Sequence, residues 1–112
     1  MSKENKQLVS PELIRPLAIR ALRRSNVRKK IAEYLFDISP SYSYTSEIAY
    51  HVRTTPSNVI GAIRGMDTRY KEEESLLYLN IIEEKNCGNG SIRLYGITDF
   101  GKEMLRTIKD HR

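Results

Sequence analysis

Hydrophobic residues recur at helical spacing in the first part of the chain. The sequence Ser10-Pro11-Glu12 is typical of a helix start, because a hydroxyl cap, a proline and an acid all suit the first turn. Pro16 has no amide hydrogen to donate, so it must kink this helix or begin a second one. The apolar stripe of the helix comprises Leu13, Ile14, Leu17, Ala21 and Leu22.

The next segment predicts a second amphipathic helix. Ser25 is its expected cap, and the helix should run from Asn26 to about Ile38. Spacings of three and four define one buried face, which comprises Val27, Ile31, Tyr34, Leu35 and Ile38.

The centre of the chain predicts a short strand and two closely linked helices. Residues 42–44 suit the strand, and Thr45 is the expected cap of the helix that follows. A tight connection at Arg53-Thr54 then leads to Thr55-Pro56, a cap followed by proline that begins another helix. The residues expected to face inward are Ile48 and Val52 in the first of these helices, and Val59, Ile63 and Met66 in the second.

The last third predicts a hairpin and a closing helix. Residues 81–85 and 91–97 read as strands, and the loop at 86–90 is rich in Asn and Gly, which tolerate positive φ. Thr98 is the expected cap of the last helix, whose apolar side comprises Phe100, Met104, Leu105 and Ile108. This order of elements predicts a mainly α fold with a small β-hairpin (α+β). At 112 residues the chain suits one domain, which we place at residues 10–112 after a disordered or frayed tail at 1–9.

The positive charge is concentrated at the start of the chain. The net charge is +5, but residues 1–30 hold nine basic and two acidic side chains (+7), and the remainder holds ten and twelve (−2). A basic block of this kind indicates an anionic partner, most often nucleic acid. A solvated helix face, or pairing with the acidic residues 72–74, explains it equally well.

Four sequence motifs occur in the order found in winged helix-turn-helix proteins. They are SEIAYHV at 46–52, TTPSNVIGAI at 54–63, LLYLNIIEE at 76–84 and YGITDFG at 95–101. In this respect the chain resembles small archaeal and bacterial transcription regulators of the MarR-like kind. The resemblance implies a helix-turn-helix at about 45–66, a wing at about 81–97, and extra N- and C-terminal helices. The charged segment Asp67–Glu74 departs from the pattern, as an extended recognition helix or an inserted loop.

The helix at 56–64 carries the sharpest functional hypothesis. Short polar residues at a helix start can approach base edges, and an arginine can pair with guanine or phosphate. Ile60 could meet a thymine methyl or pack on the 67–74 segment, and Gly61 could instead pack against a neighbouring backbone inside the core. The residues expected to contact DNA from this helix are Thr55, Ser57, Asn58, Ile60, Gly61 and Arg64.

Two further groups are expected to flank the recognition helix on DNA. Phosphate contacts are assigned to Arg20, Arg24, Arg28, Thr45 and Ser46, although capping alone explains the two hydroxyl residues. Wing contacts are assigned to Lys85, Asn86, Asn89 and Arg93. Glu83 and Glu84 in the same strand would repel DNA, and ordinary hairpins also have Asn-Gly tips.

The sequence argues against several classes of function. One cysteine and two histidines argue against a metal site, and we expect no metal and no cofactor. No set of nucleophile, base and orienting group is present, so we do not expect an enzyme. The chain has no apolar stretch of about 18 residues and no signal peptide, which predicts a cytoplasmic protein.

Two hypotheses on function remain open. The first is sequence-specific binding of double-stranded DNA by a transcription regulator that acts as a homodimer, since the amphipathic helices at both ends exceed what the central motif needs. The alternative is a winged-helix protein–protein interaction module in a transcription or replication assembly, with weak or no DNA binding.

Overall fold

The computed structural model describes residues 11–66, 71–88 and 92–110. In chain order these residues form α1 (Pro11–Arg24), α2 (Asn26–Ile38), α3 (Thr45–Val52), α4 (Pro56–Arg64), the short 3-10 helix η2 (Glu72–Glu74), β1 (Ile82–Cys87), β2 (Ile92–Ile97) and α5 (Asp99–Asp110). The predicted mainly α fold with a two-stranded antiparallel hairpin is confirmed. The expected tail at 1–9 lies outside the described residues.

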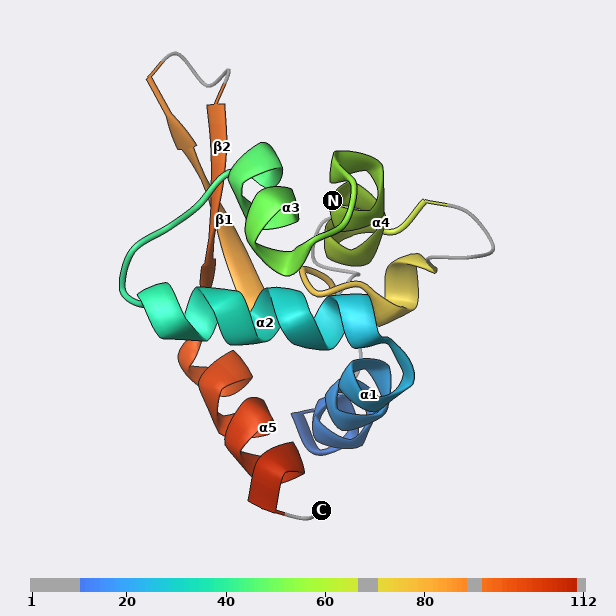
Figure 1. The fold of residues 1–112 in the computed structure, drawn as a ribbon. Coiled ribbons are helices and arrows are strands. Elements are labelled where there is room, and N and C mark those ends of the chain that lie inside the picture. Colours follow the sequence, from blue (N-terminus) through green and yellow to red (C-terminus); the bar gives the residue numbers. More distant parts are fainter. Residues whose placement is uncertain (1–10, 67–70, 89–91, 111–112) are drawn as a thin grey trace, which may run out of the picture.

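Helix α2 runs across the middle of the molecule and separates two groups of elements. Figure 1 shows α3, α4 and the hairpin on one side of it, and α1 and α5 on the other. It packs against α1, α3, α4, β2 and α5, and Ile31, Ala32 and Leu35 are fully buried. Because burial of apolar surface is the main favourable term in folding, α2 joins the two groups into one core.

Most of the predicted helix starts are confirmed by capping hydrogen bonds. The hydroxyl of Ser25 accepts from the amide of Arg28 at 3.1 Å, and that of Thr55 accepts from the amide of Asn58 at 3.1 Å. The hydroxyl of Thr98 accepts from the amide of Gly101 at 2.8 Å. Each bond satisfies an amide that the first helical turn leaves without a partner.

One expectation near a helix start is wrong, and one of the two alternatives at Pro16 is ruled out. Thr45 is not a cap: it is the first residue of α3, and Tyr44 occupies the cap position without a side-chain hydrogen bond. The hydroxyl of Ser43 instead donates to the carboxylate of Glu47 at 2.6 Å and ties the first turn down. Pro16 begins no second helix, because α1 continues through it to its end.

The hairpin pairs residue for residue from Ile82 opposite Ile97 to Cys87 opposite Ile92. The strand predicted at 42–44 is reduced to one bridge, in which Ser43 and Tyr95 exchange backbone hydrogen bonds of 2.9 and 2.8 Å. The hairpin is thereby fixed to the loop that precedes α3.

The chain from Lys71 to Leu77 lies against the end of α4. Gly65 has a φ of 86°, and a Cβ there would lie 2.6 Å from the Cα of Glu72, so only glycine fits this crossing. The amides of Leu76 and Leu77 then donate to carbonyls of Ala62 and Ile63 at 3.0 and 3.1 Å. Met66 was expected to face inward, but it lies beyond the helix and is 52% exposed.

The apolar faces of the two terminal helices cover each other within one chain. Helices α1 and α5 are in contact, and their inward residues belong to the same buried cluster, which includes Ile14, Ala18, Leu22, Met104, Leu105 and Ile108. These faces were the reason for expecting a homodimer. Because they are covered here, they give no argument of their own for a second copy.

The junction between the hairpin and α5 is closely packed around one carbonyl oxygen. The oxygen of Ile81 accepts from the amide of Thr98 at 3.1 Å and from its hydroxyl at 2.9 Å. A Cβ at Gly101 would lie 2.1 Å from the same oxygen. The glycine that closes the YGITDFG motif is therefore required by the approach of the two backbones.

Replacing Gly101 with alanine should lower the free energy of unfolding by about 1–3 kcal/mol, the usual cost of overpacking a tight site. Urea denaturation followed by circular dichroism would measure it. The matched control is Lys102→Ala, one residue further along α5, which should stay within about 0.5 kcal/mol of the unmodified chain. Equal unfolding midpoints for both variants would contradict the close packing at Ile81.

Candidate nucleic-acid interface

A hollow of about 550 Å³ lies between the start of α3, α4 and β2. We refer to it as the α3–α4–β2 hollow, and its lining comprises Tyr44, Thr45, Ser46, Pro56, Ile60, Arg64, Ile92, Arg93 and Tyr95. Five of these residues were singled out from the sequence, namely Thr45, Ser46, Ile60, Arg64 and Arg93. The fold thus brings together candidate residues from three separate segments of the chain.

The hollow combines apolar and cationic surface. Ile60 is half-buried in its lining, and two large apolar side chains that also line it are exposed, Tyr44 at 48% and Ile92 at 54%. Arg64 and Arg93 lie among them. A ligand in this hollow would meet guanidinium groups beside hydrophobic contacts.

One carboxylate holds both arginines of the hollow. Arg64 donates to one oxygen of Glu84, and the Nε of Arg93 lies 3.7 Å from the other. Arg64 also donates to the hydroxyl of the buried Tyr95 at 3.5 Å. Arg64 was expected on the exposed side of α4, but it is half-buried and turned toward the hairpin.

The polar residues at the start of α4 differ in how accessible they are. Thr55 and Ser57 are exposed, as expected. Asn58 is half-buried, and its side-chain amide donates to the hydroxyl of Thr54 at 2.9 Å, which stiffens the turn between α3 and α4. Gly61 was expected on the exposed side but is buried, so the interpretation of a glycine packed inside the core is the correct one.

The predicted wing residues are only partly described. Lys85 and Asn86 are exposed on β1, and the Nζ of Lys85 lies 4.3 Å from the centre of the Tyr42 ring. The hydroxyl of Tyr42 donates to Glu83, and this hydrogen bond raises the pKa of Tyr42 above its ordinary value, with desolvation and the charge of Glu83 acting in the same direction. Asn89 lies outside the described residues.

The basic cluster near α1 and α2 is partly neutralised inside the fold. Arg28 is 4% exposed and lies 3.5 Å from one oxygen of Glu74, while Arg24 lies 3.4 Å from the other. The phosphate contact expected of Arg28 is wrong for this structure, because its side chain is buried, and Arg24 is engaged by the same carboxylate. The alternative of pairing with the acidic segment is confirmed for both residues. Arg20 is exposed.

Sequence reasoning treated Glu84 only as a repulsive charge and missed its partners. Side chains two residues apart on a strand lie on the same face, so Glu84 shares a face with the buried Ile82. This alternation indicated that Glu84 faces the body of the protein. The pairing of Glu84 with Arg64, by contrast, depends only on how α4 packs on the hairpin.

Among residues 11–66, 71–88 and 92–110, no group of three His, Cys, Asp or Glu side chains could hold a metal ion. None of the helices in these ranges has the length and apolar character needed to cross a membrane.

Replacing Glu74 with glutamine should lower the free energy of unfolding by about 1–2 kcal/mol, because it removes the charge opposite the buried Arg28 guanidinium. The cost is below that of a fully buried pair, since Glu74 keeps some exposure to water. Thermal or urea unfolding would measure it. The adjacent exposed Glu73 supplies the control, and Glu73→Gln should be close to neutral. A loss of equal size in both variants would show that the Arg28–Glu74 pair contributes nothing specific.

Comparison with known proteins identifies a family but no activity. Over 103 residues the chain is 40% identical to the uncharacterized protein MJ0905 of Methanocaldococcus jannaschii, covering 91% of this chain and 90% of that protein. No solved structure matches this chain. Residues 18–108, which include the α3–α4–β2 hollow, match the family described as EarA-like. The chain therefore belongs to the EarA-like family.

Proposed function

We propose that this chain binds duplex DNA at specific sequences and regulates transcription. The observation that carries the proposal is the α3–α4–β2 hollow, where the start of α3, the exposed side of α4 and strand β2 meet. Two helices joined by a tight turn and followed by a hairpin are compatible with a winged helix-turn-helix. The likeness of the sequence to MarR-like regulators supports the same reading.

In this proposal α4 enters the major groove and the hairpin lies beside it. Ser57 at the exposed start of α4 would approach base edges, and Ile60 would meet a thymine methyl from within the hollow. Ser46 at the start of α3 would bind a phosphate, together with Arg93 from the hairpin.

Arg64 and Arg93 are available to DNA only if Glu84 releases them. A phosphate group would compete with Glu84 for these guanidinium groups, and an arginine–phosphate pair is a strong, charge-assisted contact. Glu84 would therefore lower the affinity for every sequence, and a site would need good contacts to α4 to compensate. This penalty makes stable binding depend on those contacts to α4.

The proposal extends to a homodimer in the cytoplasm, where the DNA lies. Two-fold symmetry would then place half-sites about 10 bp apart or at a multiple of that spacing. The exposed Leu13 on α1 offers an apolar contact for a second copy. The mass of the complex on a bound duplex gives the number of chains directly.

The second candidate function is a protein–protein interaction module. The observation that favours it is the exposed Tyr44 and Ile92 at the hollow, since aromatic and aliphatic anchors dominate protein interfaces. Under this candidate function the carboxylate of Glu84 would remain paired and no DNA would bind.

A selection of bound fragments from genomic DNA, followed by titration of an enriched fragment, tests the proposal. We expect an enriched motif and an affinity that falls steeply between about 50 mM and about 200 mM salt. Ser57→Asp should weaken binding at least about tenfold, because it places a negative charge against phosphates, while an acid in the first turn leaves α4 stable. Ser41→Asp, an exposed loop position, is the control with the same added charge.

The outcomes of this selection separate the two candidate functions. Binding without an enriched motif would contradict sequence-specific recognition. The absence of binding even at low salt would contradict the whole proposal and favour the interaction module.

Replacing Glu84 with glutamine should raise the affinity for duplex DNA about tenfold, the equivalent of one released charge-assisted contact. Fluorescence anisotropy with an enriched and an unrelated duplex would measure it, and the gain should be similar for the two duplexes because phosphate contacts do not depend on sequence. Glu83→Gln makes the same change of charge one residue earlier on β1, where the carboxylate contacts Tyr42 rather than an arginine. Equal gains in both variants would show a general charge effect and contradict the role given to Glu84.

A further inference from the structure

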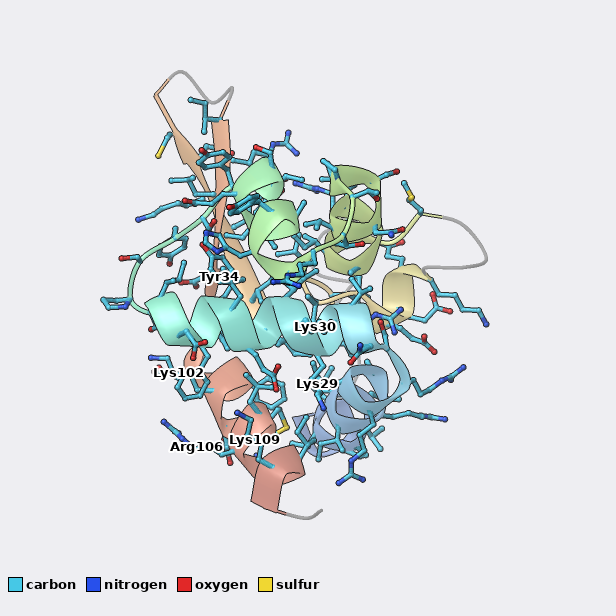
Figure 2. The ribbon with its side chains drawn as sticks, in the orientation of Figure 1. Lys29, Lys30, Tyr34, Lys102, Arg106 and Lys109 are labelled. Atoms are coloured by element: carbon cyan, nitrogen blue, oxygen red, sulfur yellow. The ribbon has the colours of Figure 1, made fainter. Side chains whose placement is uncertain are left out.

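A second group of cations lies on the side of α2 that faces away from α3 and α4. Figure 2 shows Lys29, Lys102, Arg106 and Lys109 in the half of the molecule that holds α1 and α5. We refer to the group as the α2–α5 basic face, and it comprises Arg23, Lys29, Lys102, Arg106 and Lys109.

The charges of this face are not neutralised within the described part of the chain. None of these five cations has an ion pair there, whereas Arg15, Arg24, Arg28, Arg64 and Arg93 each have one. The carboxylates on the same elements are fewer. Glu103 is occupied by Arg15 at 2.9 Å, which leaves Glu33 and Asp37 on α2 and Asp99 and Asp110 on α5.

The face has a shape that suits an extended anion. A hollow of about 650 Å³ opens where α1, α2 and α5 meet, and Arg23, Lys29 and Lys109 line it together with Glu33. Lys102, Arg106 and Lys109 follow one side of α5 over a length of about 10 Å. At about 3.4 Å of helix axis per phosphate on one strand, this length spans about three phosphates. The guanidinium of Arg106 is held 5.4 Å from the centre of the Phe36 ring.

The chemistry of the face favours a phosphate backbone over an acidic protein. Among the described residues, the exposed large hydrophobic side chains are Leu13, Tyr44, Tyr50, Met66 and Ile92, and none lies on α2 or α5. Protein interfaces depend on apolar and aromatic anchors, whereas binding of a phosphate backbone depends mainly on charge and needs no such anchor.

We infer that the α2–α5 basic face binds the phosphate backbone of a second segment of duplex DNA without reading its sequence. The inference rests on the proposed function, which supplies the first segment at α4. Because α2 separates this face from α4, a straight duplex in the α3–α4–β2 hollow does not reach it (Figure 1). One chain would therefore hold two segments of DNA at once.

The double variant Lys102→Gln/Arg106→Gln tests the inference, because it removes two charges and keeps good helix formers. An arbitrary duplex is titrated at about 50 mM and about 200 mM salt, and the ratio of the two affinities is compared between the proteins. This ratio should be about ten times smaller for the double variant than for the unmodified chain, as two lost phosphate contacts predict. The control is Lys71→Gln, which removes an exposed charge outside both surfaces and should leave the salt dependence unchanged.

A bridging assay provides the second measurement. Beads that carry one duplex should retain a second, labelled duplex in the presence of the full chain, and the α5 double variant should lose this retention while still binding the first duplex. Bridging and salt dependence equal to those of the control would overturn the inference, even with specific binding at α4 intact.

The same measurements distinguish failure of the inference from failure of the proposed function. The proposed function fails if no motif is enriched and Ser57→Asp has no effect. If the α5 double variant nevertheless shows the smaller salt dependence given above, phosphate binding by the α2–α5 basic face stands. A labelled polyglutamate peptide that binds the unmodified chain but not the α5 variant, with DNA binding unchanged between them, would overturn the inference in favour of an acidic protein partner.

Discussion

The whole structure depends on the burial of α2 on two opposite sides. Its apolar residues are shared between the layer formed by α3, α4 and the hairpin and the layer formed by α1 and α5. A helix that is packed on both sides cannot rotate or slide without breaking contacts in both layers. The two candidate surfaces are therefore held in fixed and opposite directions, so the protein can present each of them without changing shape.

The electrostatics of the chain are governed by two carboxylates that each hold a pair of arginines. Glu74 holds Arg24 and Arg28, and Glu84 holds Arg64 and Arg93. The Glu74 pair is structural, because Arg28 is buried, while the Glu84 pair lies at a hollow open to a ligand. A net charge of +5 therefore says little about which cations can meet an anion. Of the ten lysines and arginines that form no ion pair among the described residues, five lie on α2 and α5, so the accessible positive charge is spread well beyond the first 30 residues, where the sequence concentrates its excess.

Local rules predicted the elements well, and they failed where distant segments meet. Ser25, Thr55 and Thr98 cap their helices because capping depends on a few neighbouring residues. Thr45 was misplaced by one position, since Ser43 is held by its bridge to Tyr95 and sets where α3 begins. The burial of Gly61 and the exposure of Met66 depend on how the chain at 71–77 lies against the end of α4, which spacing along the chain does not encode. The pairing of Arg64 with Glu84 likewise exists only once α4 rests on the hairpin.

The bridge between Ser43 and Tyr95 gives the hairpin two unequal halves. At Tyr95 strand β2 is hydrogen-bonded on both edges, to β1 and to the loop before α3. Toward Cys87 and Ile92 it has β1 alone, and a two-stranded ribbon in water is only marginally stable. Amide hydrogens near the tip should therefore exchange with solvent far sooner than those at the base. The paired ends at Cys87 and Ile92 can therefore bend to follow a curved surface while Tyr95 and Glu84 keep their positions.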